Sequence, residues 1–143
     1  MKRLAAVFLL FPITLLANDI RVDLKVIDAA VVEHEVELST ELDPYKDELH
    51  SLPYNSFEIK NIQQFSLPLD EVQEIDLPDS EVLKVRVFYS NHEKSCLWLQ
   101  WLDFDKRELL NTRIHLRSDK PVIVGSEVAD GVGGRILTIK LAQ

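Results

Sequence analysis

Three carboxylates lie close together in one polar connection of the chain: Asp103, Asp105 and Glu108. An Asp-x-Asp pair followed by a third carboxylate offers hard oxygen ligands of the kind that calcium takes. Two carboxylates also serve as the acid and base of glycoside hydrolysis. The connection lacks the glycine of a calcium loop, and Lys106 and Arg107 lie within it. We interpret it as a charged hairpin tip, with a small calcium-dependent glycan binder or hydrolase as the alternative.

A second candidate is the glycine-rich stretch, because all four glycines lie between Gly125 and Gly134. A phosphate cradle requires a strand that leads into a helix, usually with a Lys and a hydroxyl residue. Here the glycines separate two strand-like runs, 122–128 and 135–141. Glycines that supply positive φ in a hairpin turn explain this arrangement, so we expect a hairpin and no cofactor.

The histidines show no pattern of a metal or catalytic site. No pair has the helical spacing of two zinc ligands, and no Gly-x-Ser-x-Gly motif is present. The four histidines are spread over the chain, at His34, His50, His92 and His115. The sequence therefore predicts no catalytic residue and no metal ligand.

Aromatic and cationic side chains form the most promising surface. Trp98 and Trp101 fall on opposite faces of one expected strand, which is then covered on both faces or presents one face to a partner. The next strand carries a cationic row on an acidic protein, namely Arg113, His115 and Arg117. This row is a solvated strand face or a docking site for an acidic partner or glycan. These five residues are the predicted partner surface.

The elements that position these side chains are mostly strands. Apolar and polar residues alternate through much of the chain, as in sheets with one wet face. Short polar connections separate the runs and favour antiparallel neighbours. We expect about eight strands, near 20–27, 57–66, 71–77, 81–90, 96–103, 109–117, 121–128 and 135–141. This pattern predicts a mainly β fold, an antiparallel β-sandwich-like meander.

One short helix is expected after residue 42. Asp43 is suited to cap it, Pro44 to its first position, and Pro53 ends it. At two to three turns such a helix is not stable alone, so it must pack on the sheet. Its apolar residues fall at helical spacing: Leu42, Tyr45, Leu49 and Leu52. Residues 28–40 extend the first strand or form a loop.

The first 17 residues have the pattern of a cleaved signal peptide. Lys2 and Arg3 precede an uncharged apolar run that ends near Ala17. Its removal leaves a single domain, 18–143, with 14 Lys and Arg against 24 Asp and Glu, a net charge of −10. Such a surface repels nucleic acids. The only cysteine, Cys96, lies in an apolar run, so we expect it to be buried.

The order of motifs resembles small secreted bacterial β-rich proteins of uncharacterised role. The resemblance rests on the Asp-Pro-capped helix leading into 54–57, on the run 109–112, and on 121–125 before a glycine-rich hairpin. It implies a β-rich fold and a bacterial envelope setting, and it transfers no catalytic residue.

These observations predict an exported, non-enzymatic binding or assembly module of the bacterial envelope, located in the periplasm or secreted. Its expected partner is another envelope or secreted protein. We expect no cofactor, and no transmembrane anchor once the signal peptide has been removed.

Overall fold

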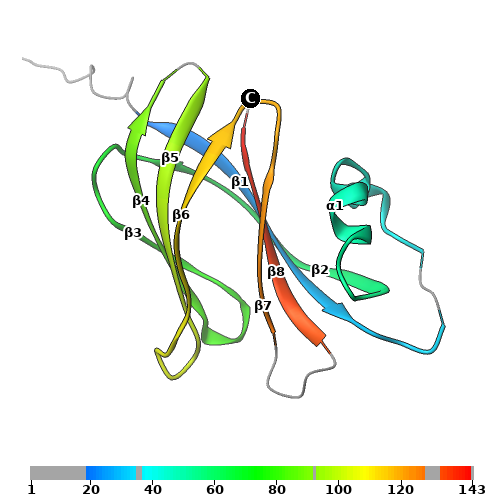
Figure 1. Cartoon of the computed structure of the whole chain (residues 1–143). Helices are drawn as coiled ribbons and strands as arrows, with labels where there is room; N and C mark the ends of the chain where they lie inside the picture. Colours follow the sequence, from blue (N-terminus) through cyan, green and yellow to red (C-terminus); the bar gives the residue numbers. More distant parts are fainter. Residues whose placement is uncertain (1–18, 35–36, 92, 128–132, 143) are drawn as a thin grey trace, which may run out of the picture.

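The computed structural model describes residues 19–34, 37–91, 93–127 and 133–142 (Figure 1). Its elements are eight strands and one short α-helix. Their bounds are β1 Ile20–Ala30, α1 Lys46–His50, β2 Ser56–Leu67, β3 Gln73–Asp76, β4 Val82–Ser90, β5 Lys94–Leu102, β6 Glu108–Arg117, β7 Val122–Glu127 and β8 Gly133–Leu141. The signal peptide predicted at residues 1–17 lies outside the described residues.

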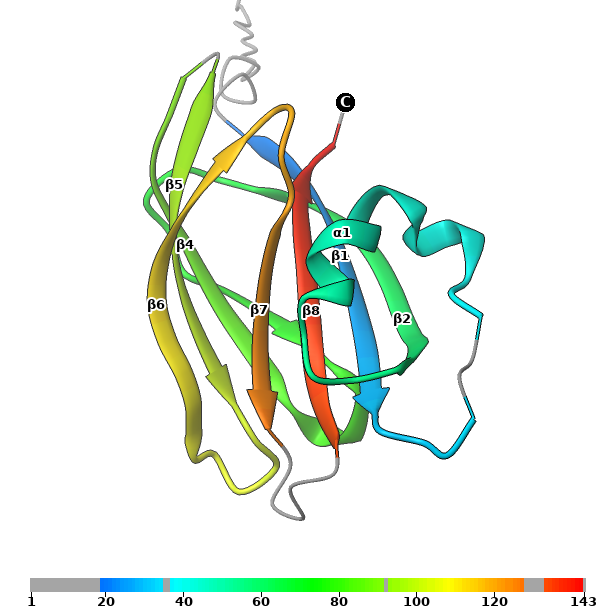
Figure 2. The ribbon, with the colours of Figure 1, turned by 45° about the vertical axis from the view of Figure 1, so that its right-hand side comes forward.

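The strands form two four-stranded antiparallel sheets that lie face to face (Figure 2). The first sheet has the order β2-β1-β8-β7, and the second has the order β3-β4-β5-β6. The second sheet is a meander of consecutive strands, whereas the first pairs the N-terminal strand with the C-terminal one. The prediction of a mainly β, sandwich-like fold with about eight strands and one helix is confirmed.

The core lies between the two sheets and follows from the alternation. In β1 the inward positions are Val22, Leu24 and Val26, which are all at most 1% exposed. The same face-to-face packing includes alternate residues of β4, β5, β6 and β8, because successive side chains of a strand point to opposite faces. The largest of these side chains is Trp101, which is fully buried.

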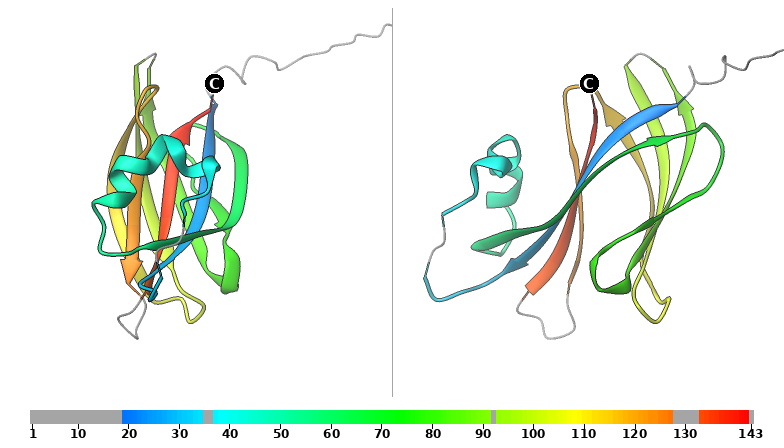
Figure 3. Two further views of the ribbon diagram at one scale, coloured as in Figure 1. Left: turned by 90° about the vertical axis from the view of Figure 1, so that its right-hand side faces the viewer. Right: turned by 180° about the vertical axis from the view of Figure 1, so that it is seen from behind.

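A β-bulge in β2 contributes to a second apolar cluster on the outside of the first sheet. Alternation places Ile27 and Ala29 of β1 on this outer face. The register of β1 and β2 shifts between Val26 and Ile27, with Lys60 of β2 as the extra residue, so that Phe57 and Ile59 also turn to the outer face. These side chains pack against the helical segment, together with Ile136 of β8. The helical segment covers the outer face of the first sheet, opposite to the second sheet (Figure 3).

The helical segment begins earlier than predicted. A 3₁₀-helix covers Thr40–Tyr45, and the hydroxyl of Ser39 accepts a hydrogen bond from the Glu41 amide at its start. Asp43 is therefore not the cap, and Pro44 lies inside this turn rather than at the first position of an α-helix. The apolar residues were placed correctly, since Leu42, Tyr45 and Leu49 are buried on the sheet.

A second bulge interrupts β4. Its register with β5 shifts between Val87 and Tyr89, which pairs with Cys96. Strict alternation would put Tyr89 on the same face as Leu83, Val85 and Val87, but the bulge moves Tyr89 to the outer face, where it is 41% exposed. Bulges of this kind re-aim side chains at the margin of a sheet.

Among the described residues, no helix is long and apolar enough to cross a membrane.

Candidate functional site: the outer face of the second sheet

The two tryptophans of β5 have different environments. Trp101 faces the core and its indole Nε1 donates to Glu81 Oε1 at 3.0 Å, so it is not part of a surface. Trp98 faces outward and is only partly buried. Its Nε1 donates to Asn111 Oδ1 at 2.8 Å, which fixes the orientation of the indole. The predicted partner surface therefore loses Trp101 and keeps Trp98.

The cationic row predicted on β6 lies exposed on the same outer face as Trp98. Arg113, His115 and Arg117 alternate with the buried residues of the strand. The cross-strand partner of Arg113 is Trp98, and the partner of His115 is Cys96. The row and the indole therefore form one continuous surface.

Phe88, at the bulge of β4, completes this surface and was not among the predicted site residues. The guanidinium carbon of Arg113 lies 4.5 Å from the centre of the Phe88 ring, and that of Arg86 lies 5.3 Å from it. A cation above an aromatic face is attracted by the quadrupole of the ring. We define the basic-aromatic patch as Arg86, Phe88, Trp98, Arg113, His115 and Arg117.

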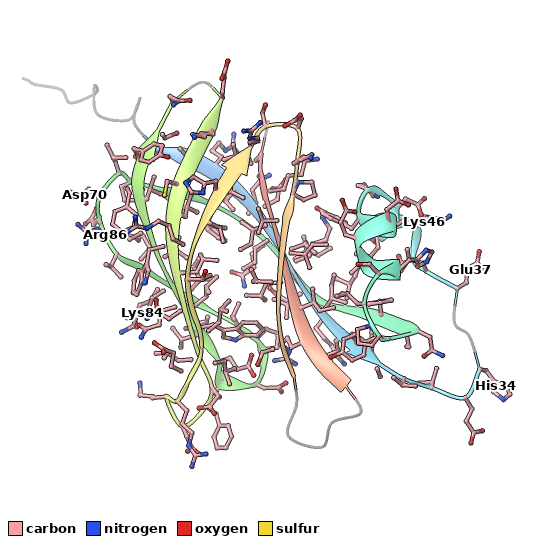
Figure 4. The ribbon with its side chains drawn as sticks, viewed as in Figure 1. His34, Glu37, Lys46, Asp70, Lys84 and Arg86 are labelled. Carbon is pink, nitrogen blue, oxygen red and sulfur yellow. The ribbon has the colours of Figure 1, made fainter. Side chains whose placement is uncertain are left out.

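The two arginines that contact Phe88 differ in their partners. Arg86 donates through Nε and Nη2 to Asp70 Oδ1, at 3.0 and 2.6 Å, at the edge of the patch (Figure 4). Arg113 forms no ion pair within the described part of the chain. Its guanidinium is therefore held in place by the Phe88 ring while its charge remains unneutralised.

One carboxylate lies at the lower margin of the patch. Glu108 Oε1 accepts hydrogen bonds from Gln100 Nε2 at 3.0 Å and from Asn111 Nδ2 at 2.8 Å. These bonds, first from Gln100 and then from Asn111, lower the pKa of Glu108 below its ordinary value. Glu108 thus orients the side-chain amide of Asn111, which in turn orients the indole of Trp98.

Cys96 is buried on the outer side of β5, as expected from the sequence. It lies opposite Tyr89 in one direction and His115 in the other. The free thiol therefore contributes to the layer beneath the patch.

The carboxylates of the charged hairpin tip serve the turn itself. Asp103 Oδ1 accepts hydrogen bonds from the amides of Asp105 and Arg107, at 2.8 and 2.9 Å. Lys106 adopts a left-handed conformation with a φ of 63° to close the turn. Within the described residues, no group of three His, Cys, Asp or Glu side chains is arranged to hold a metal ion. The hydrogen bonds of Asp103 agree with the interpretation of this connection as a charged hairpin tip.

The described histidines are also distributed over separate elements. His34 lies in the loop after β1, His50 ends α1 and His115 lies on β6, while His92 is outside the described residues. The two strands predicted around the glycine-rich stretch are the antiparallel pair β7 and β8, with residues 128–132 outside the description.

One charged cluster was not anticipated from the sequence. Arg135 of β8 is 11% exposed and crosses between the sheets, with Nε donating to Asp28 Oδ1 at 2.8 Å and Nη2 to Asp79 Oδ2 at 2.7 Å. Nη1 donates to the carbonyl oxygen of Pro78 at 3.1 Å and lies 3.2 Å from Glu81 Oε1. Burial would lower the pKa of Arg135, but the hydrogen bonds to Asp28 and Asp79 outweigh it and raise the pKa above its ordinary value.

The surface of the described residues has several hollows, and this cluster borders the first of two large ones. The first, of about 600 Å³ at the end of the sandwich, includes Arg135, Trp101 and the exposed ring of Phe104. All five N–H groups of a guanidinium can be satisfied by the acceptors around Arg135, so the cluster fastens the two sheets rather than offering donors to a ligand. The second hollow, of about 760 Å³, lies beside α1 and includes Lys46, His50 and Tyr54.

The chain matches no protein-family model, no curated protein and no solved structure. The chemistry of its own side chains is therefore the basis on which its function is proposed.

Proposed function

We propose that the protein is an exported, non-enzymatic binding or assembly module of the bacterial envelope, and that the basic-aromatic patch docks an acidic segment of an exported partner. The observation that carries this proposal is Arg113, stacked 4.5 Å above Phe88 with no ion pair among the described residues.

The patch has the composition of a binding surface. Aromatic residues and arginine are enriched where partners contribute most of the binding energy. Trp98 is fixed by Asn111, and Arg113 by Phe88, so neither side chain loses much rotamer freedom when a partner arrives. Pre-ordered side chains of this kind lower the entropic cost of association.

The charge of the patch indicates the chemistry of the partner. A guanidinium presents planar N–H groups that match a carboxylate in a bidentate pair. Arg117 and His115 extend the positive charge along β6 on the same exposed face. A segment rich in Asp and Glu therefore complements the patch, whereas the remainder of the protein is acidic and repels such a segment.

Export is supported by the N-terminal residues and by the single cysteine. A cationic start followed by an uncharged apolar run is typical of a signal peptide. A lone thiol is exposed to oxidation outside the cytoplasm, and Cys96 is buried at 2% exposure. The proposal accordingly assigns the protein partners outside the cytoplasm.

The test is a calorimetric titration with a soluble peptide of alternating Glu and Ala, and with its Gln counterpart. We expect the Glu peptide alone to bind, and salt to weaken the binding. Arg113→Gln removes a charge-assisted hydrogen bond, so we expect about a tenfold loss of affinity. Equal binding of both peptides, or no binding of the Glu peptide, would refute the proposal.

The matched control is Arg21→Gln, which makes the same change of charge at an exposed position of β1 in the first sheet. We expect it to leave peptide binding unchanged. Arg113 is exposed, so Arg113→Gln should change the free energy of unfolding by less than about 0.5 kcal/mol. If both variants weaken binding equally, overall charge and not the patch accounts for it.

A further inference from the structure

The helical segment carries a surface of opposite charge to the patch. Four carboxylates are exposed over residues 40–50, which we call the acidic segment: Glu41, Asp43, Asp47 and Glu48. Within the described part of the chain, none of them forms an ion pair. The buried residues Leu42, Tyr45 and Leu49 hold the segment on the sheet, so its acids are presented on a supported element.

The acidic segment and the patch lie on opposite sides of the molecule. The segment covers the outer face of the first sheet, while the patch lies on the outer face of the second (Figure 3). In Figure 4, Lys46 of the segment and Arg86 of the patch mark the two sides. A single chain therefore cannot bring its own segment onto its own patch.

We infer that one partner of the patch is a second copy of this chain, whose acidic segment docks on it. This inference rests on the proposed function and names an occupant for the same surface. The charges complement each other, since the segment offers carboxylates and the patch offers the guanidinium of Arg113, none of which has an ion-pair partner among the described residues.

The geometry determines the kind of assembly. The two complementary surfaces differ and lie on opposite sides, so the contact is heterologous. In a pair of chains, one copy keeps a free acidic segment and the other keeps a free patch. Such contacts produce open, head-to-tail rows unless the rotation between copies closes a ring. Like net charge opposes approach at long range, but at about 0.15 M salt the screening length is about 8 Å and the direct contacts persist.

Sedimentation velocity of the exported protein, over a range of concentrations up to about 1 mM, tests this inference. We expect the mean mass to increase with concentration and the increase to be lost in 1 M salt. Two charge-reversed variants separate the surfaces: Arg113→Glu with Arg117→Glu, and Asp47→Lys with Glu48→Lys. Each variant alone should remain monomeric.

Their mixture provides the decisive measurement. In the mixture, the native acidic segment of the patch-reversed variant meets the native patch of the segment-reversed variant, and the two reversed surfaces also carry opposite charges. Both contacts can therefore form, so we expect the mixture to recover the growth in mean mass that each variant alone lacks. Arg21→Glu, which reverses a charge away from both surfaces, should assemble like the wild-type protein.

The outcomes separate this inference from the proposed function. A wild-type protein that stays monomeric at every concentration, or a mixture that does not associate, overturns the self-assembly. If that monomer still binds the Glu peptide, the patch docks an acidic partner other than its own copy. If the reversed variants alone still assemble, the contact uses other surfaces and the inference is wrong.

Discussion

The outer face of the first sheet is covered by the chain's own helical segment, whereas the outer face of the second sheet carries aromatic side chains that no described element covers. Both faces have apolar residues at outward positions, including Ile27 and Ile136 on the first and Phe88 and Trp98 on the second. On the first face Leu42 and Leu49 pack over them and are fully buried. On the second, Arg86 and Arg113 lie over the Phe88 ring instead.

The difference shows two ways to treat an apolar sheet face. Packing a helix on the first face removes its apolar side chains from water and stabilises the fold. Stacking guanidinium groups on the second face covers the rings but leaves charge at the surface. The first arrangement serves stability, and the second leaves a surface that a partner is able to cover.

The largest expected effect concerns the covered face. Leu49→Ala removes a fully buried side chain between α1 and the first sheet, so we expect it to lower the free energy of unfolding by about 3 kcal/mol. Urea unfolding measures this loss. Truncation on the uncovered face, by Trp98→Ala, should lower the free energy of unfolding by a smaller amount. An equal loss for the two variants would mean that the two faces do not differ as described.

A smaller effect is expected at Gly134 of β8, which is closely packed against Tyr54 and Ser126. A Cβ at Gly134 would lie 2.6 Å from the Tyr54 hydroxyl oxygen and 3.0 Å from the Ser126 carbonyl oxygen. Gly134→Ala should therefore destabilise the protein by about 1–3 kcal/mol. Tyr54→Phe removes the nearest atom, so the double variant should recover part of the loss in thermal unfolding. A strictly additive double variant would contradict this account.

The smallest effect is expected for an acid of the uncovered face. The hydrogen bonds from Gln100 and Asn111 lower the pKa of Glu108 from its ordinary value of 4.5, so the folded state favours the ionised form. This contribution to stability is present above the unfolded pKa and is lost as the pH falls through the lower, folded pKa. Glu108→Gln should remove this pH-dependent contribution. The free energy of unfolding of both proteins, measured across this acidic range, would detect the difference. Identical pH profiles would show that these hydrogen bonds do not form in solution.

The strands were predictable because alternation is a local property of the sequence. It also identified the two faces of β5, but not which face lies inside, because that depends on where the second sheet packs. The bulges were not predictable, because a bulge is defined by the partner strand: Lys60 of β2 is recognised as the extra residue only from its pairing with β1. The inversion at Lys60 turns Phe57 and Ile59 to the outer face, where the helical segment docks.

The site was predictable in part. Alternation placed Arg113, His115 and Arg117 on one exposed row, and the composition of β5 indicated Trp98. Phe88 was missed because its contact with Arg113 joins two strands that are not neighbours in the sheet. Arg135 was missed for a related reason, since Asp28 and Asp79 are both distant from it in the sequence.

The pairing of β1 with β8 also has a kinetic consequence. The four strands of the second sheet follow one another along the chain and form by successive hairpins, whereas the first sheet cannot be completed before residues 133–141 are available. Contacts between distant segments form slowly, because a long loop must close before they are made. A chain in which residues 133–141 have not yet been synthesised therefore lacks the central strand pair of this sheet. The sandwich closes only after β8 is available.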